Sequence, residues 1–458
     1  MPFRRFFGRG NERARPADAP PDDAEEAGKD DDATAQDDDA GTPEWDAGIP
    51  EGQSSATEIE GDWRARAAAV IPGGASTGSK QPQNLFGDAA SEYPGHFLRA
   101  SGCHLVTVGE RTLLDCTMAL GAVSLGYADE GVTRAVVSAA AAGHVAGLAH
   151  YLEIEVAERL CDLIPCAERV RFLKSGAEAT AAAVRIARAA TGRTRVIATG
   201  YLGWHDWSNA GPGIPAGAHA DVTRVPFDDM VALQDAVRDA ARDLAAIVLE
   251  PVVDREPSPE WLGAARSLCD EAGAVLIFDE MKTGFRLRPG GYQEVSGVTP
   301  DLATFGKALA NGYPLAAVVG RDRVMSAAQE TWISSTLAGE AVALAAAAAV
   351  IERYDSEGDV CARLGEIGAA MRAGVDAAIR ASGVGGVRIE GLDAMWQLRF
   401  DRPDVERAFL ERAVRHGALF KRGAYNYASL AHGEGDVLTE LESIASAALV
   451  ELMEEGIA

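Results

Sequence analysis

Short apolar runs alternate with amphipathic stretches through the middle of the chain. Each run has the length and composition of a buried strand; they occupy residues 170–173, 196–198, 246–249, 275–278 and 316–319. The stretches between them have helical periodicity and occupy residues 153–163, 177–190, 230–241 and 261–272. This alternation predicts an α/β fold, with a mostly parallel sheet flanked by helices on both faces.

The flanking segments have other patterns. Residues 97–115 alternate like small antiparallel strands, and residues 337–354 form a long Ala-rich helical stretch followed by a smaller α+β pattern. We expect the N-terminal strands to pack with this C-terminal part in one small domain. The predicted organisation has four parts. Residues 1–60 form an acidic extension, and residues 61–120 form the N-terminal part of the small domain. Residues 121–336 form the large domain, and residues 337–458 form a connector helix with the rest of the small domain.

The first sixty residues carry 17 Asp and Glu against six Lys and Arg, with almost no periodic apolar pattern. Such a segment cannot bury enough apolar surface to offset its ordering entropy, so it is predicted to be disordered. Its favoured role is solubility, and a docking tail for a basic partner is the alternative.

Composition excludes several classes of function. The formal net charge of −26 argues against nucleic acid or an anionic membrane as a partner, because both are polyanions. No secretory signal or membrane span is evident. The six cysteines lack the paired spacing of a metal site, which predicts reduced thiols in a cytoplasmic protein without a metal.

An acid and a lysine occupy informative positions after two of the apolar runs. Asp279 ends the run at residues 275–278, and Lys307 follows a short run about 28 residues later. A lysine can hold an aldehyde cofactor as a Schiff base, and an aspartate can keep a pyridine nitrogen protonated. The pair predicts pyridoxal 5'-phosphate (PLP) as the cofactor. Lys174 and Lys282 are weaker candidates for the Schiff base.

Other candidate cofactor ligands also follow apolar runs, where open α/β sheets bind ligands. Ser175 suits a helix N-cap, with free N–H groups at Gly176 and Ala177 for a phosphate; an ordinary helix cap is the alternative. Trp204, beside His205, could cover a planar ring, whereas Trp207 is expected to pack on the core or at an interface.

Glu250 ends another apolar run, and Pro251 disfavours a helical conformation there. A buried carboxylate requires a partner. Glu250 is therefore expected either at the cofactor site or bridged to an arginine.

From about residue 62 onward, the chain resembles the class III, fold-type I PLP-dependent aminotransferases, most closely the glutamate-1-semialdehyde 2,1-aminomutase group. The motifs that carry the resemblance lie at residues 71–74, 174–179, 278–286, 305–312 and 334–337. The resemblance implies a Schiff base on Lys307 and a contact from Asp279 to the pyridine nitrogen. It also implies that Thr336 reaches the phosphate of a partner subunit, in a homodimer with shared active sites.

The resemblance implies amino-group transfer between a small amine or amino acid and a keto acid or semialdehyde, by an aminotransferase or an aminomutase. A PLP decarboxylase or racemase is an alternative, and a non-catalytic interaction protein is a further one. Lys80 replaces the arginine with which aminomutases bind a substrate carboxylate, and Lys282 stands where the family has Gln or Met. Gly423 and Ala424 replace a gating acid. These departures leave the substrate open.

Overall fold

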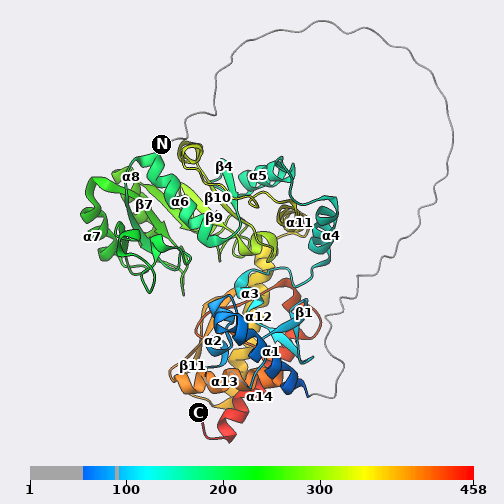
Figure 1. Ribbon diagram of the computed structural model, residues 1–458. Coiled ribbons are helices and arrows are strands. Elements are labelled where there is room, and N and C mark those ends of the chain that lie inside the picture. Colours follow the sequence, from blue (N-terminus) through cyan, green and yellow to red (C-terminus); the bar gives the residue numbers. More distant parts are fainter. Residues whose placement is uncertain (1–54, 88–91, 458) are drawn as a thin grey trace, which may run out of the picture. The chain divides into compact units, whose positions relative to one another are not determined.

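The computed structural model describes residues 55–87 and 92–457 (Figure 1). Residues 1–54 of the predicted acidic extension lie outside these ranges, so its predicted disorder stays a prediction. The domain boundaries at residues 60, 120 and 336 also stay predictions. In the part of the chain that is described, no helix is long and apolar enough to cross a membrane.

The largest sheet of the described residues has seven strands, in the order β4–β10–β9–β8–β7–β5–β6. All neighbouring strands are parallel except β10, which is antiparallel to both β4 and β9. The strands are β4 Arg169–Leu173, β5 Arg195–Thr199, β6 Val222–Arg224, β7 Leu244–Leu249, β8 Val275–Asp279, β9 Leu302–Phe305 and β10 Ala316–Gly320. The predicted mostly parallel sheet is confirmed.

The two faces of this sheet belong to two different cores. Along β8, Leu276 and Phe278 belong to one core, and Val275 and Ile277 belong to the other. Helix α6 (Gly176–Thr191) packs in the second core. The first core is covered by α4 Glu130–Ala142, α5 Leu152–Leu163, α7 Met230–Ala240, α8 Pro259–Ala272 and α11 Ala341–Ser356. Burial on both faces explains why the central strands are continuously apolar rather than alternating.

Two smaller sheets are built from the flanking segments. The first has the order β1–β2–β3–β13 and consists of Phe97–Ser101, His104–Thr107, Thr112–Asp115 and Ala418–Leu419. The second has the order β11–β12–β14 and consists of Val387–Leu392, Met395–Phe400 and Asn426–Tyr427. Because β3 pairs with β13, N-terminal and C-terminal segments share one sheet, as predicted. The helices of this part are α1 Ala56–Val70, α2 Pro82–Phe86, α12 Val360–Ser382, α13 Pro403–His416 and α14 Val437–Glu454.

Capping residues explain where two helices begin. Helix α1 begins at Ala56, because Ser55 and Glu58 form a capping box ahead of it. Helix α11 begins at Ala341 rather than at residue 337, because the Glu340 side chain accepts from two backbone N–H groups of its first turn.

Glu280, which directly follows β8, has a structural role. Its buried carboxylate accepts from the Thr283 hydroxyl and from the backbone N–H groups of Tyr292 (2.8 Å) and Gln293 (3.1 Å). Glu280→Ala leaves these donors without their partner, at about 1–3 kcal/mol each. We expect the free energy of unfolding in urea to fall by about 3 kcal/mol or more. The matched control is Glu366→Ala at an exposed position of α12, where a change within about 0.5 kcal/mol is expected; equal effects of the two variants would contradict the role of Glu280.

Candidate active site

Asp279 and Lys307 line one cavity of about 370 Å³ at the carboxyl ends of β8 and β9. Because these strands are parallel neighbours, their ends meet at the same edge of the sheet. Lys307 begins the short 3-10 turn that follows β9, and its φ of 51° lies in the left-handed region.

Asp279 is buried, and its surroundings determine the pKa of its carboxyl group. Its Oδ1 accepts from the Met281 N–H (3.0 Å) and from the Thr304 hydroxyl (3.2 Å). Burial, and then the nearby carboxylate of Glu250, raise the pKa of Asp279 to about 7. A positively charged group in the cavity would favour the ionised carboxylate.

Three lysines line the cavity, and their pairing distinguishes them. Lys174 forms an ion pair with Glu340 (2.7 Å) and Lys282 forms one with Glu250 (2.6 Å). Within the described ranges, Lys307 has no ion-pair partner. Burial, and then the ammonium of Lys282, lower the pKa of Lys307 to about 8. Lys307 is therefore the lysine best prepared to act as a neutral amine.

The start of helix α6 presents backbone N–H groups to the same cavity. Ser175 is its N-cap and forms a capping box with Glu178, whose carboxylate accepts from the Ser175 N–H (2.8 Å). In the described structure, the N–H groups of Gly176 and Ala177 have no protein acceptor. Gly203 packs closely here, because a Cβ on it would lie 2.7 Å from the Cα of Ala177. The helix start thus has both an ordinary cap and free donors for an anion.

Trp204 lines the cavity, and its side chain is 71 % exposed. The other aromatic candidates lie elsewhere. His205 contacts Trp204 edge-on, with 4.9 Å between ring centroids, but lines a neighbouring cavity. Trp207 packs against the core around α6, as predicted. Thr336 and Lys80 line two further cavities, separate from that of Lys307.

Glu250 lies at the site, but its partner is a lysine and not an arginine. Its second carboxylate oxygen accepts from the Tyr201 N–H (3.0 Å), and Lys282 also donates to the Tyr425 hydroxyl (3.1 Å). Sequence reasoning considered Lys282 only as a weaker Schiff-base candidate and missed its ion pair with Glu250. Its position could have indicated a role at the site, because the family that the chain resembles has Gln or Met there.

Lys282 is expected to hold the pKa of Lys307 low. In Lys282→Met the repelling ammonium is lost and the Glu250 carboxylate is unpaired, and both changes favour a protonated Lys307. The pKa of Lys307 should therefore rise above about 8. Acetylation of Lys307 in cofactor-free protein, followed against pH by peptide mapping, measures this change. Lys282→Arg keeps the charge and is the control; an unchanged profile in Lys282→Met would contradict the coupling.

Comparison with known proteins gives this geometry its context. The family described as aminotransferase class-III matches residues 88–431. The chain belongs to this family. It is a PLP-dependent enzyme of amino-group transfer, and its fold is that of the fold-type I PLP transferases.

Two relatives and one solved structure illustrate the similarity. The chain is 31 % identical over 395 residues to a 3-aminobutyryl-CoA aminotransferase of Cloacimonas acidaminovorans, covering 82 % of this chain and 94 % of the relative. It is 37 % identical over 330 residues to a glutamate-1-semialdehyde 2,1-aminomutase of Methanothermobacter thermautotrophicus, covering 68 % and 76 %. The PLP internal aldimine form of the FumI protein from Sphingopyxis sp. MTA144 matches with a TM-score of 0.82 and 27 % identity, covering 88 % of this chain and 98 % of that one.

Proposed function

We propose that Lys307 binds the PLP aldehyde and that Asp279 pairs with its pyridine nitrogen. The observation that carries this proposal is the cavity itself, in which Lys307 is the lysine without an ion pair and Asp279 is a buried carboxylate. When bound, PLP supplies an electron sink for bonds at the carbon that carries the amine. Reduction of the purified enzyme with borohydride should fix a pyridoxyl group on Lys307, detected by peptide mapping. A label on Lys174 or Lys282 instead would overturn the assignment.

The remaining residues of the cavity are proposed to bind and orient the cofactor. The free N–H groups of Gly176 and Ala177, with the Ser175 hydroxyl, suit the phosphate, and Trp204 suits one face of the ring. Glu250 and His205 complete the proposed cofactor-binding set, Glu250 through its pair with Lys282 and His205 through its contact with Trp204. When not bound to the cofactor, Lys307 Nζ could accept a proton from the substrate carbon and return it. The lowered pKa of Lys307 favours this role.

For the substrate, we propose a small amine or amino acid, with a keto acid or semialdehyde as its partner. Both relatives described above support this class, one as an aminotransferase and one as an aminomutase. Lys80 is the proposed residue for a substrate carboxylate. A panel of amino donors with and without an added keto acceptor separates the two reactions. Conversion without an acceptor identifies an aminomutase, and strict dependence on the acceptor identifies an aminotransferase.

The proposed assembly is a homodimer in the cytoplasm. Exposed apolar side chains near Thr336 support the dimer, because Leu148 is 87 % exposed and Trp332 is 89 % exposed. Six free cysteines support a reducing compartment. Sedimentation analysis should give twice the mass of the chain, and Trp332→Glu should shift the assembly toward monomer. A monomeric wild-type protein would overturn this assignment.

A further inference from the structure

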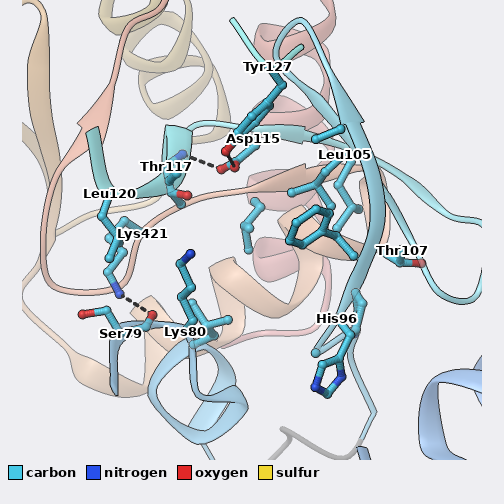
Figure 2. A pocket seen from close by; sticks show the side chains of 18 of the residues that line it. Ser79, Lys80, His96, Leu105, Thr107, Asp115, Thr117, Leu120, Tyr127 and Lys421 are labelled. Carbon is cyan, nitrogen blue, oxygen red and sulfur yellow. Dashed lines mark hydrogen bonds between the residues drawn. The ribbon is translucent and has the colours of Figure 1, made fainter. Parts of the chain in front are cut away.

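A second cavity, of about 210 Å³, lies away from Lys307, beside the sheet β1–β2–β3–β13 (Figure 2). It shares no lining residue with the cavity around Lys307. Much of its wall is apolar and includes Phe86 of α2, Leu105 of β2, Leu113 of β3 and Leu419 of β13.

Two lysines line one side of this cavity. Lys421 is only 7 % exposed, and its Nζ donates one hydrogen bond, to the Ser79 carbonyl (3.2 Å). Lys80 is an exposed residue that lines the cavity, and Figure 2 shows its side chain directed into the cavity beside Lys421, opposite Leu105. In the described residues, neither lysine has a carboxylate within ion-pair distance.

A buried ammonium without a carboxylate partner is costly, so Lys421 needs an explanation. Burial, and then the charge of Arg422, lower its pKa. One bond to Ser79 leaves two N–H donors of the ammonium available. Asp115 also lines the cavity, but its carboxylate already accepts from the Thr117 N–H (2.6 Å) and the Tyr127 hydroxyl (2.7 Å).

We propose that this cavity binds a hydrocarbon carboxylate, with the carboxylate on Lys421 and Lys80 and the hydrocarbon against Phe86, Leu105 and Leu113. A carboxylate satisfies the free donors of Lys421 with charge-assisted hydrogen bonds. The apolar wall selects a ligand with an aliphatic or aromatic body, and the volume limits that body to a small molecule. The ligand is either the distal part of an amino substrate or a separate effector. Only the first case rests on the proposed function.

Direct binding to the cofactor-loaded enzyme tests the site. Calorimetric titration with carboxylates from acetate to octanoate should show tighter binding as the chain lengthens until the cavity is filled. Hexyltrimethylammonium, which cannot form a Schiff base with the cofactor, and hexanol serve as ligands of opposite charge and no charge, and should bind at least tenfold more weakly than hexanoate. Equal binding of the three, or no binding of any carboxylate, would overturn the proposal.

Three variants locate the binding. Lys421→Met keeps most of the length of the side chain and removes its charge, so it should weaken carboxylate binding about tenfold or more. Lys421→Arg should retain most of the affinity. Leu105→Trp fills the apolar part and should abolish binding, while the yellow absorption of the bound cofactor is kept as a check of folding. Unchanged affinity in both Lys421→Met and Leu105→Trp would overturn the location.

The kinetics of amino transfer then identify the source of the ligand. In Lys421→Met, an increase in KM for the amino donor at constant kcat places the distal part of the substrate in this cavity. If added hexanoate changes the kcat of the wild-type enzyme without competing with the amino donor, the cavity is an effector site. Carboxylate binding to a protein that transfers no amino group would leave this site in place and contradict the proposed function alone.

Discussion

Lys307→Ala is expected to lose amino-transfer activity by on the order of 10³-fold or more, because no other lysine of the cavity can replace it. Lys174 and Lys282 are each held by a carboxylate, so neither is a free amine. The variant should also lose the yellow absorption of the enzyme. Steady-state kinetics at saturating donor, with the absorption spectrum of the purified protein, measure both effects.

Lys174→Ala is the matched control, because it removes a lysine from the same cavity but not the proposed nucleophile. Its activity should fall much less, and its absorption should persist. If Lys307→Ala retained wild-type activity, or if the two variants behaved alike, the assignment of Lys307 would be wrong. Added alkylamines should restore part of the activity of Lys307→Ala, because they can supply a free base in the space left by the side chain.

Asp279→Asn is expected to lower kcat by about 10²–10³-fold, the usual effect of removing one preorganised electrostatic contact. Asparagine keeps an oxygen that can accept from the Met281 N–H and the Thr304 hydroxyl, so the change isolates the charge. The variant should fold with little loss of stability. The measurement is kcat over pH, together with a urea unfolding curve.

The pH profile gives this prediction a second test. In the cofactor-free protein, burial raises the pKa of Asp279 to about 7, so its carboxyl is neutral below that pH and ionised above it. Cofactor binding should therefore weaken as the pH falls through about 7, and this dependence should disappear in Asp279→Asn. A variant that kept both kcat and the pH dependence would show that the charge has no role.

Local sequence patterns were sufficient for most strands of the seven-stranded sheet and for much of the site, although β6 was not predicted. Continuous apolar runs revealed β4, β5, β7, β8 and β10, and the polar residues at their ends led to Ser175, Trp204, Glu250 and Asp279, which all line the cavity of Lys307. Strand ends of one parallel sheet must share an edge, so the positions of these residues followed from the alternation alone.

The sequence could not predict which side chains pair with each other. The ion pair between Glu250 and Lys282 joins residues that follow two different strands, and no local pattern specifies which cation reaches a carboxylate. The burial of Lys421 could not be predicted either, because it depends on segments near residues 80 and 420 that meet only in the folded chain. Helices α12 and α14 were not assigned either, although they pack against each other.

The backbone of Lys307 has a φ of 51°, a conformation that costs an L-residue about 1–2 kcal/mol and a glycine almost nothing. The same residue also keeps a buried amine close to the ammonium of Lys282. Evolution toward greater stability alone would therefore replace Lys307 with glycine. With lysine at this position, the cofactor-free chain is expected to be less stable than its fold could be, and a cofactor bound there would raise the stability by mass action.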